Sequence, residues 1–180
     1  MLIVIFILPI FSLESYSLLK HTTSQLGGQN MPYAWIMNMV FIFLGLGSIL
    51  ASWNYLSGYF LHRILILIFG TVLVLTAFYS HAPIENSIPY NIEEDKVHSY
   101  LAKITGFSFT FFAIAMAFII RDRTNIIIAI VVAIIDTLFS IIMFDILEFT
   151  GIFQRAIFIL SFGWLIYVLV KRIELKNGIQ

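Results

Sequence analysis

Six apolar runs separated by short polar stretches constrain the fold of this chain more than any other feature. Five of the runs are long, and they predict helices over 33–53, 62–79, 100–120, 125–144 and 153–170. A backbone surrounded by lipid must satisfy its N–H and C=O groups within one segment, so such runs form helices rather than strands. The sequence therefore predicts an all-α transmembrane bundle that forms one domain over residues 1–180.

The first run, MLIVIFILPIFSL, predicts a sixth helix near residues 1–19. It has neither the basic start nor the small-residue cleavage site of a signal peptide. Because about 20 apolar residues are needed to cross the hydrocarbon core, we expect the true start to lie further upstream. The prediction is thus a bundle of six transmembrane helices.

Composition supports lipid as the surrounding solvent. Of the 180 residues, 61% are hydrophobic and 11% are charged, whereas soluble domains carry about 25% charged residues. The net charge of zero gives no electrostatic basis for binding nucleic acid. The chain has no cysteine, which excludes disulfides, thiolate metal sites and cysteine nucleophiles.

An even number of crossings places both termini at one end of the bundle, which we name the basic end. The opposite end, which we name the histidine end, carries three of the four histidines. The cations near the basic end are Arg63, Arg121, Arg123, Lys171, Arg172 and Lys176, and those near the histidine end are Lys20, Lys96, Lys103 and Arg155. Cytoplasmic loops carry the excess of Lys and Arg. We therefore predict a multi-pass protein of the plasma membrane with both termini in the cytoplasm and the histidine end outside.

The candidate site lies at the histidine end. His21, His81 and His98 are potential metal ligands, because three neutral imidazoles and a water form an open catalytic zinc site. Asp95 precedes His98 by one helical turn and is either a fourth ligand or a group that orients an imidazole. Ser24 is a candidate for holding a water or a substrate oxygen. Plain hydrogen-bonding roles, or two axial ligands to haem, are the alternatives for these histidines.

Arg155 has two interpretations. In one it forms a salt bridge with Glu148 or Asp145 across the turn around Gly151. In the other its planar fork binds a phosphate or a carboxylate. The first role is structural and the second is functional.

Asp136 lies near the middle of a predicted helix, where a carboxylate costs about 2.5–3.5 kcal/mol. It is either a proton or ion relay, or it forms one interhelical hydrogen bond to a serine, a threonine or an asparagine such as Asn38. The relay hypothesis corresponds to a small transporter.

Several motifs occur in a characteristic order: HTTSQLGGQN at 21–30, AWIMN at 34–38, SHAPI at 80–84, EDKVHS at 94–99, GFSF at 106–109 and GIFQRA at 151–156. In this respect the chain resembles the prokaryotic membrane-protein family known as domain of unknown function 998. The resemblance implies a six-helix integral membrane protein with no firmly established activity. It singles out His21, Ser24, Gly27, Trp35, Asn38, Asp95, His98, Gln154 and Arg155.

A looser likeness is to the intramembrane hydrolases that include alkaline ceramidases and adiponectin receptors, which use histidines, an aspartate and a serine around zinc. Those bundles have seven helices and paired histidines on the last one, and this chain has no histidine beyond His98. Three hypotheses therefore stand: metal-assisted hydrolysis of a lipid-like substrate, a non-catalytic scaffold or accessory subunit that contacts membrane lipid, and a transporter using Asp136. A protein partner or a second copy of the chain is compatible with each of them.

Overall fold

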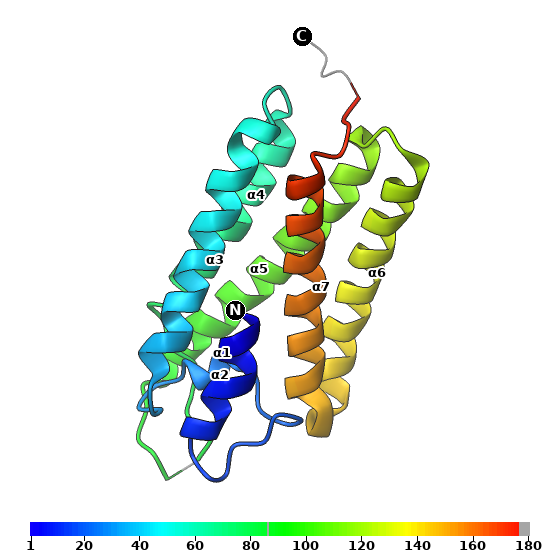
Figure 1. Cartoon of the computed structure of the whole chain (residues 1–180). Coiled ribbons are helices and arrows are strands. Elements are labelled where there is room, and N and C mark those ends of the chain that lie inside the picture. The colour runs from blue at the N-terminus through cyan, green and yellow to red at the C-terminus, as the bar shows by residue number, and fades with distance from the viewer. Residues whose placement is uncertain (86, 177–180) are drawn as a thin grey trace.

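The computed structural model describes residues 1–85 and 87–176, and these form a bundle of α-helices (Figure 1). The long helices are α3 (Ala34–Tyr55), α4 (Phe60–Leu75), α5 (Ile92–Ile119), α6 (Arg123–Asp145) and α7 (Thr150–Lys171). Each packs against the next in the sequence, and α5 crosses obliquely between the α3–α4 pair and the α6–α7 pair. Within the described ranges the β-structure is a single bridge between Ile120 and Leu175.

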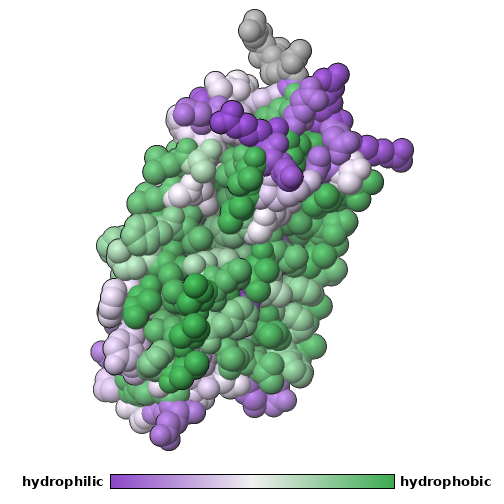
Figure 2. Space-filling model, in the orientation of Figure 1, coloured by the Kyte–Doolittle hydropathy of each residue, from purple (hydrophilic) through white to green (hydrophobic). Residues whose placement is uncertain are grey.

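Apolar and polar side chains are distributed over the surface as in a membrane protein. On the face shown in Figure 2, apolar side chains form a broad belt across the middle of the bundle, and hydrophilic side chains gather at its two ends. Four helices, α3, α5, α6 and the segment Leu147–Lys171 that contains α7, are long and apolar enough to cross a membrane. Leu2–Phe11 and Phe60–Leu75 are shorter apolar helices. The helical, membrane-like architecture is confirmed, and the count of six crossings stays a prediction.

The first predicted helix is wrong in its length. Residues 1–19 contain only α1 (Leu2–Ile7) and the 3-10 helix η1 (Leu8–Phe11), followed by an irregular loop. Pro9 lies at the start of η1, and a proline removes a backbone donor and clashes with the preceding turn. The ten residues rise about 15 Å at about 1.5 Å each, roughly half of the hydrocarbon thickness. Accordingly, the N-terminus lies about half-way along the neighbouring α7 (Figure 1).

Helix α5 begins eight residues earlier than the predicted start at 100. The side chain of Asn91 caps its N-terminus by accepting hydrogen bonds from the N–H groups of Glu93 and Glu94. Carboxylates in the first turn are stabilised by the positive end of the helix dipole. Hydropathy alone therefore placed this boundary too late, because the first two turns are polar.

Aromatic side chains from α4, α5 and α7 fill the centre of the bundle. The ring centroid of Phe109 lies 5.1 Å from that of Phe69 and 5.9 Å from that of Trp164. Gly45 and Gly70 bring α3 and α4 into backbone contact, whereas Gly47 faces open space. The core thus holds the long helices together, and the loops of the histidine end close over it.

Asp136 of α6 is 3% exposed and accepts a hydrogen bond from Ser161 Oγ of α7 at 2.5 Å. The predicted interhelical hydrogen bond is therefore present, with Ser161 rather than Asn38 as the partner. The transporter hypothesis stays a prediction.

Candidate functional site

The histidine end contains two separate polar clusters. The first, which we name the arginine dock, joins residues 16–24 to the N-terminal turns of α7 through Gly151, Gln154 and Arg155. The second, which we name the histidine cluster, contains His81, Asp95 and His98. The predicted site residues are therefore divided between two places: His21, Ser24 and Arg155 belong to the dock, and His81, Asp95 and His98 to the cluster.

Arg155 is the centre of the dock and is only 1% exposed. Its Nη1 donates to the carbonyl oxygens of Leu18, His21 and Gly151, each at 2.9 Å. Its Nε donates to the Ile5 carbonyl at 3.2 Å, and its Nη2 donates to the Tyr16 hydroxyl at 2.6 Å. A guanidinium has five N–H groups in a fixed fork, and here that fork attaches α1 and the following loop to α7.

This environment corrects the salt-bridge interpretation of Arg155 and bears on the other one. Its partners are carbonyls and a phenol, and Glu148 instead pairs with Lys20 at 3.1 Å on the surface. The predicted salt bridge with Glu148 or Asp145 is thus wrong. The fork is occupied by the protein itself, so the prediction that Arg155 binds a substrate anion has no support in its surroundings.

The two motif neighbours of Arg155 complete the dock. Gln154 Oε1 accepts hydrogen bonds from the backbone N–H and the hydroxyl of Thr23, both at 2.7 Å, and its Nε2 lies 3.5 Å from Ser24 Oγ. Gly151 donates its backbone N–H to the Leu19 carbonyl at 2.8 Å. A Cβ at Gly151 would lie 2.6 Å from the Leu18 carbonyl oxygen, so only glycine permits this approach.

His21 takes part in the dock mainly through its backbone. Its ring Nδ1 accepts the Ser17 N–H at 2.9 Å, and the ring lies 5.4 Å from that of Tyr16. Burial, reinforced by the nearby charges of Lys20 and Arg155, lowers the pKa of His21. A neutral imidazole suits this position, because the nitrogen that accepts the Ser17 hydrogen bond must be unprotonated.

The histidine cluster connects the loop after α4 to the first two turns of α5. His81 Nδ1 and Asp95 Oδ1 are 2.7 Å apart, although their angles are not those of a regular hydrogen bond. The same carboxylate oxygen accepts the Ala82 N–H at 2.7 Å. Asp95 was predicted to act beside His98, one turn away, but it contacts His81.

His98 is 2% exposed, and its Nδ1 lies 2.6 Å from the Tyr79 carbonyl. Because a carbonyl only accepts, Nδ1 carries the hydrogen and Nε2 has the lone pair. Nε2 is buried and has no hydrogen-bond partner among the described residues. The rings of His81 and His98 are 5.2 Å apart between centroids.

The His81 side chain remains 29% exposed. Burial lowers its pKa below the ordinary 6.5, and the Asp95 carboxylate partly offsets that effect. If the hydrogen of His81 is on Nδ1 and points toward Asp95, then Nε2 is unprotonated and can accept a proton. A carboxylate holds a general-base histidine in this same tautomer. His81 and Asp95 are therefore the part of the candidate site that a ligand can reach.

The metal hypothesis needs three ligands around one ion. In the described part of the chain, no three His, Asp or Glu side chains are placed to hold a metal ion. His21 belongs to the other cluster, so the residues present do not fit the predicted zinc site. We therefore derive no chemistry through a metal.

Residues 27–30 connect the two clusters. Gln29 donates its Nε2 to the carbonyls of Ser80 and Asn91, each at 3.0 Å, and its Oε1 accepts the Asn91 N–H at 2.7 Å. A Cβ at Gly27 would collide with the Asn38 side chain of α3, and one at Gly28 would lie 3.2 Å from the His81 carbonyl. The glycine pair therefore permits the loop to lie against both α3 and the loop after α4.

A family model described as "Protein of unknown function (DUF998)" matches residues 1–171 of the chain. The chain belongs to this family. Neither a curated protein nor a solved structure matches it.

The structure of this DUF998 protein explains why its motifs occur in distant parts of the sequence. HTTSQLGGQN faces GIFQRA in the arginine dock. SHAPI and EDKVHS face each other in the histidine cluster. The two motifs of each pair therefore form the two sides of one contact between segments that are distant in the sequence.

Sequence reasoning missed Tyr16 and Gln29, which have central places in these contacts. No pattern marks Tyr16, because its partners come from residues 21, 22 and 155. Asn91 could have been found, since an asparagine before three acidic residues is typical of a helix N-terminus.

Proposed function

We propose that this protein is a multi-pass module of the plasma membrane that binds membrane lipid without changing it chemically, with the histidine end outside as its binding face. The observation that carries the proposal is the enclosure of Arg155 by five internal hydrogen bonds. The groups predicted to form one catalytic pocket are divided, and half of them stabilise the fold. The exposed apolar belt supports a lasting contact with lipid (Figure 2).

The topology is part of this proposal. The basic end lies in the cytoplasm, in accord with its excess of Lys and Arg. Of the six proposed crossings, four correspond to helices long and apolar enough to span a membrane, and the other two correspond to the shorter apolar segments Leu2–Phe11 and Phe60–Leu75. A chain without cysteine permits a direct test of the orientation.

Single cysteines placed at exposed Lys20 and Ser57 mark the two ends. On intact cells, a membrane-impermeant maleimide is expected to label Lys20→Cys and to label Ser57→Cys only after permeabilisation. The opposite pattern would reverse the orientation, and equal labelling of both sites would contradict the membrane arrangement.

Lipid binding is tested by purifying the protein in mild detergent and measuring bound lipid by native mass spectrometry. We expect defined lipid adducts on the folded protein, and their absence would contradict the proposal. Light scattering of the same sample tests the predicted alternative of a second copy or a protein partner.

The second candidate function is acid–base hydrolysis of a lipid-like substrate by His81 and Asp95. The 2.7 Å contact between them and the exposed part of the imidazole favour it. We test it by incubating the protein with membrane lipid extract and measuring released products. Turnover that is abolished by His81→Asn would establish catalysis and overturn the non-catalytic proposal. Stoichiometric zinc in elemental analysis, lost in His98→Ala, would instead support the predicted metal site.

A further inference from the structure

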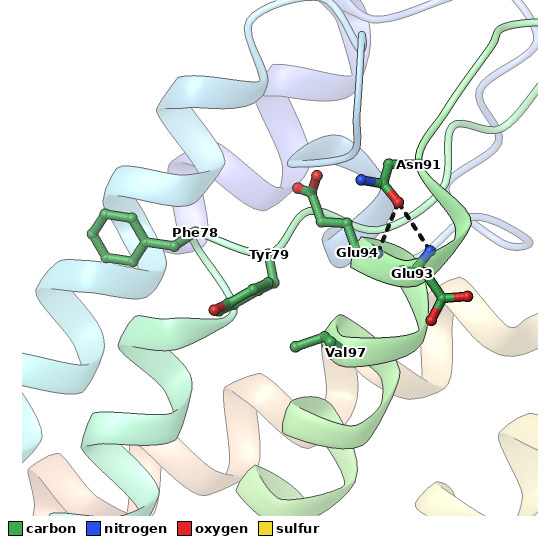
Figure 3. A pocket seen from close by; sticks show the side chains of 6 residues that line it. All are labelled: Phe78, Tyr79, Asn91, Glu93, Glu94 and Val97. Carbon is green, nitrogen blue, oxygen red and sulfur yellow. Dashed lines mark hydrogen bonds between the residues drawn. The ribbon is translucent and has the colours of Figure 1, made fainter.

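A cavity of about 300 Å³ opens between the end of α4 and the start of α5. It adjoins the histidine cluster, because Tyr79 provides the carbonyl that His98 contacts and Glu94 precedes Asp95. Figure 3 shows the residues that line it: Phe78, Tyr79, Asn91, Glu93, Glu94 and Val97. The lining combines aromatic and aliphatic surface with carboxylates, and it contains no basic side chain.

The two carboxylates differ in direction and in partners. Glu94 extends toward the side on which Tyr79 lies, whereas Glu93 points the other way (Figure 3). Glu93 is paired with Lys96 at 2.7 Å. Glu94 Oε1 accepts the Ser80 N–H at 2.7 Å, and its second oxygen has no hydrogen-bond partner within the described ranges. Glu94 is therefore the anion available to a ligand.

The aromatic rings add a second attraction for positive charge. Tyr79 is 41% exposed and Phe78 is 66% exposed. The face of an aromatic ring attracts a cation, by about 0.5–1 kcal/mol at exposed sites and more when the cation is desolvated. An ammonium group that enters this cavity can contact both a carboxylate and a ring face.

We propose that this cavity binds the ammonium group of a membrane-lipid headgroup. The inference rests on the proposed lipid-binding function and names the headgroup chemistry. The source is lipid, because the cavity lies where α4 and α5 leave the apolar belt, and exposed Phe78 and Tyr79 are typical of the membrane interface. An anionic headgroup without an amine would be repelled by the uncompensated carboxylate.

The experiment places the full-length protein in mixed micelles with equimolar phosphatidylethanolamine, phosphatidylcholine and phosphatidylglycerol. Bound lipid is then measured by native mass spectrometry. We expect the two ammonium lipids to be enriched about fivefold over phosphatidylglycerol. Glu94→Gln keeps an acceptor for the Ser80 N–H, and it is expected to reduce that enrichment to about one.

Glu148→Gln is the control, because it removes the same charge from an exposed carboxylate at the histidine end that does not line the cavity, and it is expected to keep the enrichment. Unchanged thermal unfolding of both variants shows that they fold. Bound lipid without headgroup preference, or an equal loss in both variants, would overturn this inference and leave the lipid-binding function intact. No bound lipid at all would overturn the function itself. Free ethanolamine phosphate that displaces the lipids at equal concentration would assign the site to a soluble amine and also overturn the inference.

Discussion

The arginine dock and the histidine cluster lie at the same end of the bundle and use similar side chains, but they differ in how completely those side chains are bonded. In the dock, the Arg155 guanidinium and the Gln154 amide meet internal partners. In the cluster, the partly exposed His81 and the buried His98 Nε2 leave polar atoms without partners in the described chain.

This difference distinguishes polar groups that stabilise the fold from polar groups that are available to a ligand. A buried polar group contributes to stability when all its hydrogen bonds are made, and it is costly when one is missing. A saturated cluster therefore needs no ligand. The histidine cluster lies beside a cavity and has polar atoms that can still bind a ligand. A functional site is therefore expected near His81 and Glu94 rather than near Arg155.

The largest expected effect comes from opening the dock. Arg155→Ala leaves the carbonyls of Ile5 and Leu18 without their side-chain donor, and it leaves the His21 carbonyl with only the Tyr16 hydroxyl. Each unsatisfied buried group costs about 1–3 kcal/mol. We expect a loss of about 3–5 kcal/mol in unfolding free energy, measured by thermal or denaturant unfolding in detergent.

Arg155→Lys is the conservative control for that prediction. It keeps the charge but loses the planar fork, so its unfolding free energy is expected to fall between those of the wild type and the alanine variant. Wild-type stability in Arg155→Ala would contradict the structural role of the dock.

A second way to break the dock is steric. Gly151→Ala places a methyl group against the carbonyls of Leu18 and His21, and overpacking of this kind costs about 1–3 kcal/mol. Gly163→Ala, on the same helix, meets no atom within 4 Å and is expected to be neutral or stabilising by up to about 1 kcal/mol. If the two variants unfold at the same temperature, the close approach at Gly151 is refuted.

The open cluster is expected to make stability depend on pH. Burial lowers the pKa of His81 below 6.5, so the folded state favours the neutral ring while the unfolded chain binds a proton. This contribution is fully present above pH 6.5 and is lost as the pH falls through the lowered pKa. We expect a lower melting temperature at pH 5.5 than at pH 7.5.

His81→Asn sharpens that prediction, because its amide retains a donor toward Asp95 but does not titrate. The variant is expected to reduce the pH dependence and to keep the part due to His21, whose pKa is also lowered by burial. An unchanged pH profile would show that His81 is not responsible.

The smallest effect is expected at the rim. Lys20 and Glu148 are 54% and 73% exposed in their side chains, and exposed pairs contribute about 0–1 kcal/mol. Lys20→Ala should therefore leave the melting temperature nearly unchanged. A large loss would mean that the dock depends on surface charge.

The sequence predicted several elements well and two poorly, for identifiable reasons. Runs such as 125–144 agree closely with α6 at Arg123–Asp145, because uniform apolarity permits only a helix in lipid. The prediction for 1–19 failed because the apolar run continues past Ile7, where the α-helix ends and the short η1 with Pro9 follows. The start of α5 failed because its capping turn is polar although helical.

The sequence predicted at which end of the bundle the candidate residues lie. It did not predict which groups those residues contact. All three histidines lie at one end because alternating helix directions bring residues 21, 81 and 98 to the same side. The predicted pairing of Arg155 with a neighbouring acid was wrong, because its true partners are carbonyl oxygens up to 150 residues away. Carbonyls are present in every residue and leave no signal in a sequence.

The amino-acid sequence by itself determined that this chain is helical, that it belongs in lipid, and at which end its histidines gather, since these properties follow from apolar run length and the order of the segments. Only the tertiary structure decided which polar groups are saturated and which are open. Whether a polar group finds its partners depends on distances of about 3 Å between segments far apart in the chain. Such distances are set by the packing of the whole bundle.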